Sequence, residues 1–404
     1  MLFFFSFIIA TLLLGSIMIG PLSIRVYMTC IMIFVLLFDN LKKTINCNYI
    51  KIDSSFIKFY VAFLIVMGLS QLFNGDFIEY EYVKKLLAYH LVSIVLFLAI
   101  QRYINTYRDL QNIILLVSTI LLINNMIIIL QFLGYSFGWA FGAMFGDIQS
   151  SIDYAETHDT LLGFSNTPGI FGNVVRSAFF IAVTSPLVLC LIRKDSSKII
   201  KILVFFVGIT SCIASFMTQQ RTAFALVLLS VFIYILVIFK KNPLLIFILS
   251  LFCFPIVISN IEFSQVDIGR LADNSDEIRS NLYKMAFEFI SDHPLFGGPM
   301  KFQNSAGLST HNILLDSWIF AGFFGFVIMI LLLFKTIINS FNILVKGFKL
   351  TNPDTFMIFS AIATINAMAY GFLHNTSYLT GDVIIFLVLS LMLKSFELRR
   401  YNIL

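Results

Sequence analysis

The sequence alternates long apolar runs with shorter polar stretches. The runs fall at residues 2–19, 22–38, 56–73, 86–100, 111–133, 169–192, 199–217, 222–239, 243–259, 311–334, 355–373 and 382–393. Within a run, apolar residues follow one another without the alternation that a half-exposed strand would show. A helix of about 20 residues crosses the hydrocarbon core of a bilayer, where backbone groups must bond to one another. The pattern therefore predicts about twelve transmembrane helices, within a range of about eleven to thirteen.

The composition excludes a water-soluble globular protein. Of the 404 residues, 59% are hydrophobic and only 12% are charged, and the mean hydropathy is +0.93. Soluble domains carry about 25% charged residues. The first run has no basic lead-in and no small-residue cleavage site, so we interpret it as a membrane helix rather than a removed signal peptide. The predicted fold class is an all-α, polytopic integral membrane protein, with residues 1–404 forming a single membrane domain.

The basic residues predict how the chain is oriented. If the N-terminus is inside and successive runs alternate in direction, about two thirds of the 27 Lys and Arg residues fall on the inner side. Every inner loop is then basic, as the positive-inside rule requires. The opposite orientation would place this excess of positive charge outside. We therefore expect both termini to be cytoplasmic.

This orientation leaves two long loops on the outer side, at 134–168 and 260–310. The first is rich in Gly, Ser, Asn and Pro, which favours irregular structure. The second contains the segment IRSNLYKMAFEFI, whose apolar residues share one helical face. These residues are Leu282, Met285, Ala286, Phe289 and Ile290. We expect a short amphipathic helix at the membrane surface, ended by Pro294.

Three outer-side residues could carry chemistry. Arg221 stands between two apolar runs with almost no loop, where a guanidinium either snorkels to the interface or binds an anion. Arg279 lies near the start of the amphipathic helix, and a salt bridge to nearby acids is its alternative role. His311 opens the run 311–334, either as an interfacial or capping residue or as a general base for a sugar hydroxyl. Asp316 is a poor match for orienting this imidazole, because its spacing does not bring both residues to one helix face.

Further polar residues on the same side are candidates for substrate contacts. Arg176 lies inside an apolar run, where an arginine is a functional hypothesis by default. The alternative is burial against a carboxylate or against the carbonyls of a helix end. Arginine forks bind phosphate oxygens in pairs. The sequence shows no acidic cluster beside these residues and no zinc-binding cysteine spacing, so we predict no metal and no other cofactor. The remaining candidates for substrate contact are Gln220, Asn312, His158 and His374, and interfacial polarity explains the two histidines equally well.

Four segments together resemble the O-antigen polymerase and O-antigen ligase superfamily of bacterial envelope glycosyltransferases. They are THNILLDSWIFAGFFGFVIMILLLF at 310–334, IRSNLYKMAFEFISDHPLFGGP at 278–299, TQQRTAFALVLLS at 218–230 and LLGFSNTPGIFGNVV at 161–175. They are similar, in that order, to the family's His-Asn-x-x-Leu start, its arginine followed by an amphipathic helix and a Pro-Leu-Gly turn, its Ser-Arg-Thr-Ala segment and its Asn-Pro-Asn loop. Gln219 and Gln220 stand where the family has serines, a departure that leaves the substrate open.

The resemblance implies a GT-C-like fold in the bacterial inner membrane. The donor would be an undecaprenyl-pyrophosphate-linked oligosaccharide in the outer leaflet of the lipid bilayer. Arg221 and Arg279 would hold the pyrophosphate, and His311 would activate the acceptor hydroxyl. No nucleic acid partner is expected.

The resemblance leaves the acceptor open. A polymerase would use a second lipid-linked repeat unit, and a ligase would use lipid A-core. We predict a polymerase, because polymerase sequences are the more diverse group, and a chain-length regulator protein is then a further expected partner. A polysaccharide flippase is less favoured, since it would show two similar halves and short outer loops.

Overall fold

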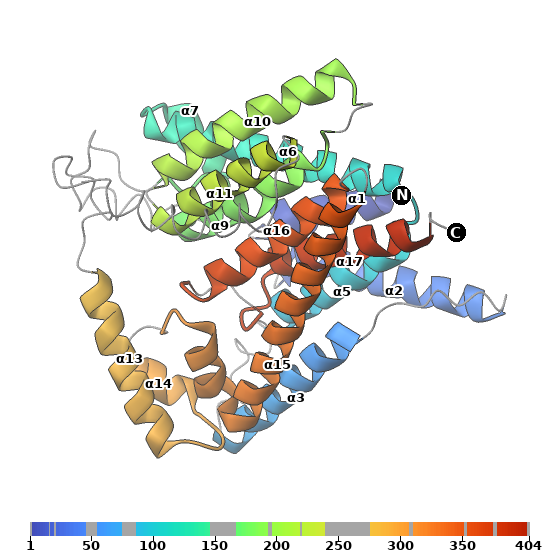
Figure 1. Ribbon diagram of the computed structural model, residues 1–404. Helices are drawn as coiled ribbons and strands as arrows, with labels where there is room; N and C mark the ends of the chain where they lie inside the picture. Colours follow the sequence, from blue (N-terminus) through green and yellow to red (C-terminus); the bar gives the residue numbers. More distant parts are fainter. Residues whose placement is uncertain are drawn as a thin grey trace.

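The computed structural model describes residues 2–15, 17–19, 22–45, 55–74, 86–145, 167–192, 196–218, 220–238, 275–306, 310–350, 354–374 and 378–401. The α-helices, labelled in Figure 1, are α1 (Leu2–Leu13), α2 (Ile24–Ile45), α3 (Ser55–Asn74), α5 (Val92–Tyr103), α6 (Tyr107–Phe132), α7 (Ser136–Ala143), α9 (Val174–Leu189), α10 (Lys198–Met217), α11 (Arg221–Ile238), α13 (Ser275–Asp292), α14 (Pro299–Ala306), α15 (Ile313–Lys349), α16 (Thr355–Gly371) and α17 (Val383–Tyr401). A π-helical turn, η2 (Leu86–Leu91), precedes α5. Every predicted apolar run within these residues contains a helix, and the run 243–259 lies outside them.

The helices are apolar enough to belong in a membrane. Four of them, α3, α6, α10 and α15, are long and apolar enough to cross one, and α1, α5, α9, α11 and α16 are shorter apolar helices. The outer faces of the bundle expose large apolar side chains, including Phe73 on α3 and Phe205 on α10, each 70% exposed. Exposing such an apolar surface to water is unfavourable, whereas contact with lipid is favourable. These observations support an all-α membrane protein, and the total of twelve spans stays a prediction.

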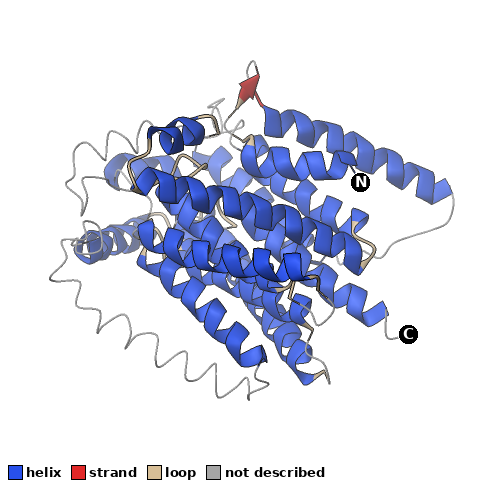
Figure 2. Cartoon of the chain, turned by 90° about the horizontal axis from the view of Figure 1, so that it is seen from above, coloured by secondary structure: helices blue, strands red, loops and turns tan. Residues whose placement is uncertain are grey.

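The start of the chain differs from the predicted pattern. The helix α1 ends at Leu13, although the apolar run continues to residue 19. Strand β1 (Met18–Ile19) then pairs antiparallel with β2 (Leu22–Ser23), a small hairpin drawn in red in Figure 2. The sequence between the strands contains Pro21, which lacks the N–H that a helix needs. Hydropathy alone therefore overestimated the first helix, because it does not register this break.

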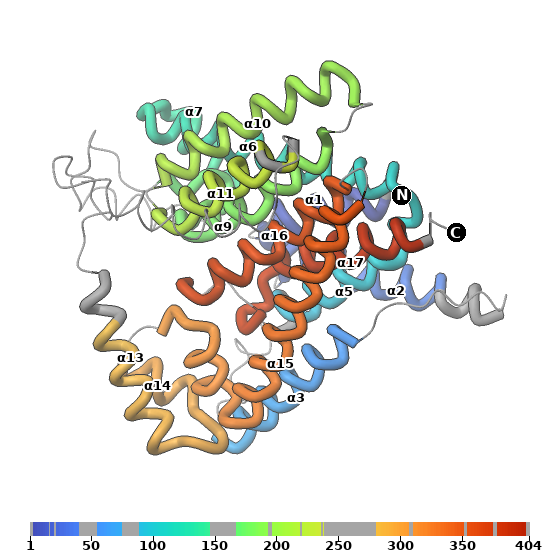
Figure 3. The backbone as a smooth tube through the Cα atoms, in the orientation of Figure 1, coloured from blue at the N-terminus to red at the C-terminus, as the bar shows by residue number. Residues whose placement is uncertain are grey.

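The centre of the bundle is formed by α9, α16 and α17. Helix α16 packs against α9, α15 and α17, and nearly every side chain of α9 and α16 is buried. Helices α6, α10 and α11 pack around α9, α5 packs on α17, and α3 lies along α15. The tube in Figure 3 shows this order, with α10 and α11 on one side of α16 and with α15 and α3 on the other. The central helices thus hold together elements that are distant in sequence.

The bundle has two ends that differ in chemistry. Helix α1 begins and α17 ends at the same end, on the right in Figures 1 and 2, which we name the terminal end. Helices α2, α9, α11 and α17 begin at the opposite end, which we name the loop end. Two hydrogen bonds tie the loop end together. Tyr370 Oη donates to Val175 O at 3.1 Å, and Ser93 Oγ donates to Gly381 O at 2.6 Å.

Helix α15 is broken near the loop end by a turn from another segment. Gly322 has φ 64° and ψ −168°, which separates two helical pieces. The turn at 294–298 bonds on both sides of this break, since Phe323 N donates to Pro294 O at 3.1 Å and Gly298 N donates to Ile319 O at 2.8 Å. A side chain at Gly322 would overlap the carbonyl oxygen of Leu295. The glycine is therefore required both by its positive φ and by the close approach of this turn.

The predicted amphipathic helix is present as α13. Its apolar side chains Leu282, Ala286 and Ile290 are buried, whereas Met285 and Phe287 are exposed. Ala286 and Ile290 belong to a small apolar cluster with Phe302 of α14 and Ile319 of α15. The buried face of this helix thus packs on protein rather than lying wholly on lipid. The helix ends at Asp292, close to the predicted stop at Pro294.

Candidate substrate-binding site at the loop end

Arg176 lies in the first turn of α9 at the loop end. Asn173 begins the helix by accepting a hydrogen bond from Arg176 N at 3.1 Å through its side-chain oxygen. The Arg176 side chain is partly buried, with Cζ 5.7 Å from the centre of the Phe171 ring. Its buried Nε has no hydrogen-bond partner. The guanidinium is therefore held in place by the ring while keeping a donor available.

A second arginine and one carboxylate face Arg176. Arg25 of α2 and Arg176 both act electrostatically on Asp382, which precedes α17. Asp382 is 9% exposed, and its Oδ1 accepts a hydrogen bond from Ile384 N at 2.8 Å, so it caps α17. The Asp382 carboxyl is buried, and the positive charges of Arg176 and Arg25 stabilise its ionised form. A buried carboxylate therefore lies near Arg176, as one of the two interpretations of the sequence held. Two arginines, however, share this one acid.

Arg25 is the more deeply buried of the two arginines. Its side chain is 3% exposed, packs against Gly15 and places Cζ 5.2 Å from the centre of the Tyr89 ring. Its Nε and Nη1 are buried and have no hydrogen-bond partner. Sequence analysis missed Arg25 and Asp382. The signal for Arg25 was the one used for Arg176, an arginine within an apolar run.

Helix dipoles make the loop end more positive still. Arg25, Arg176 and Arg221 lie in the first turns of α2, α9 and α11, and none of these first turns contains an acid. The start of a helix carries roughly half a positive charge, so a cation there is unfavourable and an anion is favourable. Three such cations at one end of a bundle create an environment for an anionic ligand.

Arg221 is the first residue of α11 and is exposed. Gln220 before it is partly buried, and its carbonyl accepts the first helical hydrogen bond, from Phe224 N at 3.1 Å. Thr167 Oγ1 donates to Met217 O at 3.2 Å, which ties the segment before α9 to the end of α10. Because α9 also packs against α11, the starts of α9 and α11 lie close together. The structure thus brings the segments that carry Arg176 and Arg221 to the same end of the bundle.

His311 has an unusual backbone conformation. Its φ of 57° makes it the single non-glycine residue with positive φ in the described part of the chain. Thr310 N and Oγ1 donate to Asp316 Oδ1 at 2.9 and 2.7 Å, and Asn312 Oδ1 caps α15 by accepting from Leu314 N at 2.9 Å. The residues on both sides of His311 are therefore fixed. Such strain clusters at functional sites, where surrounding bonds maintain it.

Asp316 has a different role from the one considered in the sequence. Its carboxylate is 4% exposed and bonds to Thr310, which precedes His311. It thereby holds the bend that presents His311. The oxygen of Asn312 serves as a helix cap, the alternative role that the sequence left open for this segment, so any substrate contact of Asn312 falls to its amide nitrogen.

Part of the chain matches a known protein family. Residues 205–330, about a third of the chain, match the family model described as O-antigen ligase. This segment is thus similar to the O-antigen ligase family, which supports the O-antigen ligase and polymerase superfamily. No curated protein and no solved structure matches the chain. The match confirms the resemblance predicted from the sequence and supports a glycosyltransferase-type activity on polysaccharide, without separating polymerase from ligase.

The O-antigen ligase segment contains most of the predicted site residues. Gln220, Arg221, Arg279, His311 and Asn312 fall within it, and Arg176 lies before it. Arg279 lies in α13, but its side chain is outside the described part of the structure, as is the whole of His158. His374, outside the O-antigen ligase segment, is buried and stacks on the Tyr370 ring, with 4.2 Å between ring centres. The roles of these residues therefore stay predictions.

Proposed function

We propose that this protein is a membrane glycosyltransferase that polymerises undecaprenyl-pyrophosphate-linked repeat units of O-antigen. The observation that carries the proposal is the gathering of Arg25, Arg176 and Arg221 in the first turns of three helices at the loop end. A lipid diphosphate offers several anionic oxygens at headgroup depth, which is the ligand that such an end favours. The match to the O-antigen ligase family supports a polysaccharide substrate.

In the proposed reaction, Arg221 and Arg279 hold the diphosphate of the donor. The bond between the anomeric carbon and the phosphate oxygen breaks, and the electron pair leaves on the diphosphate. Guanidinium groups stabilise the charge that develops there. Arg176 and the amide of Gln220 would contact the same substrate. Holding the leaving group in this way would lower the barrier to the first bond cleavage.

His311 takes the role of general base. The acceptor hydroxyl attacks the anomeric carbon, a new carbon–oxygen bond forms with inversion, and the proton moves to a ring nitrogen of His311. Imidazole titrates near neutral pH and is suited to this transfer. The fixed bend around His311, maintained by Thr310 and Asp316, supports the assignment because a base must be held in place.

The acceptor would be a second lipid-linked repeat unit. The second candidate is a ligase that transfers the polysaccharide to lipid A-core, the kind of activity that the description of the matching family names. We place the loop end on the periplasmic face of the bacterial inner membrane and both termini in the cytoplasm. The basic inner loops of the sequence support this orientation. A chain-length regulator protein would act with the polymerase.

Deletion of the gene, followed by electrophoresis of the cell's lipopolysaccharide, tests this function. A single repeat unit on lipid A-core is the expected result for a polymerase. Bare core, with polymer accumulating on the lipid carrier, would establish the ligase instead. Loss of all outer-leaflet material, with lipid-linked units trapped inside, would overturn both proposals in favour of a flippase.

A further inference from the structure

The loop end contains a buried positive cluster that the proposed reaction does not use in full. It consists of Arg25 in α2, Arg176 in α9, Asp382 before α17 and Tyr89 before α5. The two guanidiniums lie close enough to repel each other, and both act on the same carboxylate. The cluster therefore combines two cations with one anion, and two helix starts add further positive potential.

Several nitrogen atoms of this cluster are not satisfied within the protein. Arg25 is 3% exposed, yet its Nε and Nη1 have no hydrogen-bond partner, and the same holds for the buried Nε of Arg176. A buried charged donor without a partner is costly, and such groups in native proteins call for an explanation. These donors lie on two helices, and one carboxylate that already caps α17 cannot serve them all.

Among the described residues, the two other deeply buried Lys and Arg side chains have hydrogen-bond partners. At the terminal end, Lys394 is 3% exposed and bonds to Gln101 O at 3.1 Å and to Glu397 Oε2 at 2.9 Å. Arg102 is 6% exposed and donates to Asp39 O at 3.4 Å. Arg399 Nε at the terminal end also lacks a hydrogen bond, but its side chain is 38% exposed and it lies 4.0 Å from Asp354 Oδ2. Arg25 is thus the deeply buried cation that keeps unpartnered donors, and these point to a ligand.

We propose that Arg25 and Arg176 form a binding subsite for a phosphate oxyanion, with Asp382 limiting the net positive charge and Tyr89 forming the open side. Guanidinium forks match the oxygens of phosphate in pairs. Arg176 is partly buried and Tyr89 is 38% exposed, so a phosphate group approaches from this side and meets Arg25 at the back. Such a group would supply acceptors for Arg176 Nε and for one edge of the Arg25 guanidinium, whose Nε and Nη1 lie on opposite edges.

Two sources could supply this phosphate. One is the diphosphate of the lipid-linked donor, an assignment that rests on the proposed function. The other is the headgroup of an anionic bilayer lipid, which does not. The shared chemistry is a phosphate oxyanion on a lipid at headgroup depth, and the experiment separates the two sources.

The test uses the purified full-length protein in nanodiscs of phosphatidylcholine, with farnesyl diphosphate as the probe. We expect the probe to raise the unfolding temperature of the wild-type protein. Arg25→Gln and Arg176→Gln should each weaken probe binding at least tenfold, whereas Arg108→Gln, an exposed arginine at the terminal end, should leave it unchanged. Asp382→Asn keeps an oxygen for capping α17 and removes the competing charge, so it should bind the probe several-fold more tightly.

Parallel nanodiscs that contain phosphatidylglycerol identify the source. If phosphatidylglycerol stabilises the wild type and blocks the probe, the occupant is a bilayer lipid. If the probe binds equally in both kinds of nanodisc, the occupant is the diphosphate. His311→Ala should keep full probe binding, because the subsite does not include this residue. If the protein does not form polymer, the proposed function is refuted but the subsite is not. If the probe does not bind, the subsite is refuted, and this measurement requires no sugar transfer.

The ligand-free protein gives an independent measurement. If Arg25 awaits an anion, Arg25→Gln removes an uncompensated charge and should raise the unfolding temperature without ligand. Wild-type probe affinity in Arg25→Gln and Arg176→Gln would overturn the subsite. So would a loss of folding in Arg25→Gln combined with unchanged probe binding in Arg176→Gln and Asp382→Asn, since Arg25 would then be a structural residue.

Discussion

The two ends of the bundle differ in the placement of most of their cations, although Arg108 and Lys198 at the terminal end also lie in first turns, of α6 and α10. At the terminal end, basic residues lie in the last turns of α5, α15 and α17. These residues are Arg102, Lys346, Lys349, Arg399 and Arg400. A helix ends with partial negative charge, so these cations stabilise the helices that carry them. At the loop end, Arg25, Arg176 and Arg221 lie in first turns, where the dipole opposes them.

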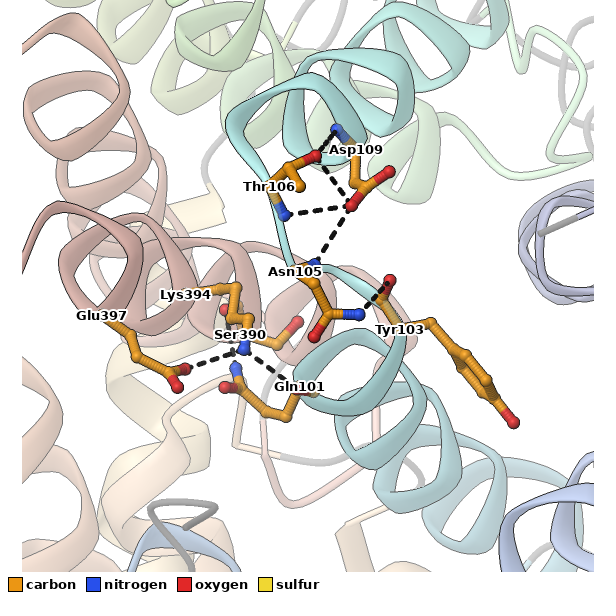
Figure 4. Close-up of polar contacts among 8 residues, drawn as sticks. All are labelled: Gln101, Tyr103, Asn105, Thr106, Asp109, Ser390, Lys394 and Glu397. Carbon is orange, nitrogen blue, oxygen red and sulfur yellow. Dashed lines mark hydrogen bonds and ion pairs between the residues drawn. The ribbon is translucent and has the colours of Figure 1, made fainter. Parts of the chain in front are cut away.

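The bonding around the charges differs in the same way. At the terminal end, Asp354 accepts a hydrogen bond from Tyr107 Oη at 3.2 Å, and Tyr103 Oη donates to Asp39 at 2.8 Å. Lys394 is bonded to both Gln101 and Glu397, as Figure 4 shows. At the loop end, Arg25 and Arg176 keep buried donors unused. In the described residues, the deeply buried cations of the terminal end thus have hydrogen-bond partners, whereas the loop end retains an electrostatic cost that an anionic ligand would reduce.

The sharpest test of this contrast is at His311. His311→Ala should abolish polymer formation, because removal of a general base slows a reaction by about 10²–10⁴-fold. The measurement is the lipopolysaccharide ladder on a gel, together with protein level and membrane insertion, which should stay normal. His293→Ala is the matched control, since His293 lies in the same family segment and its ring stacks on Phe289. Full-length ladders in His311→Ala would refute the base role.

Replacing arginines at the loop end by lysine should have the next largest effect on the rate of polymer formation. Arg221→Lys and Arg279→Lys keep the charge but lose the fork that binds two phosphate oxygens. A lost charged hydrogen bond is worth about 1.5–3 kcal/mol, which corresponds to a decrease in rate of roughly tenfold or more. The rate of polymer formation in membranes measures this. Arg108→Lys at the terminal end is the control, and near-normal rates in both loop-end variants would exclude a diphosphate clamp.

The framework of the loop end can be tested separately. Gly322→Ala places a side chain against the carbonyl of Leu295 at a positive φ, so it should destabilise the fold by about 1–3 kcal/mol or more. Gly68→Ala is the matched control, because no atom lies within 4 Å of the position that an added Cβ would take on α3. It should instead stabilise the helix, by about 0.5–1 kcal/mol. Thermal unfolding of the two variants checks the sign, and equal unfolding temperatures would contradict the tight turn at α15.

The sequence predicted the positions of the helices more completely than the residues of the site. Continuous apolar runs locate helices because each run must satisfy its own backbone in lipid. The break at Gly322 was not visible, since it lies inside an unbroken apolar run and arises from a turn at 294–298. Arg176 and His311 were found because polar residues are conspicuous in such a chain. Arg25 carried the same signal as Arg176 but was not singled out, and Asp382 was not found because its nearness to the two arginines arises only in the folded chain.

The smallest expected effect is at the terminal end. Thr106 and Asp109 form a capping box at the start of α6, with Thr106 Oγ1 accepting from Asp109 N at 3.1 Å (Figure 4). Thr106→Ala removes one cap and should lower the free energy of unfolding by about 1 kcal/mol. Because this end serves stability alone, the rate of polymer formation per folded protein should not change. Thr106→Ser restores the hydroxyl and should recover the stability. A slower rate of polymer formation in Thr106→Ala, with an unchanged free energy of unfolding, would contradict the division of stability and transfer between the two ends. A cap distant from the loop end would then affect transfer rather than folding.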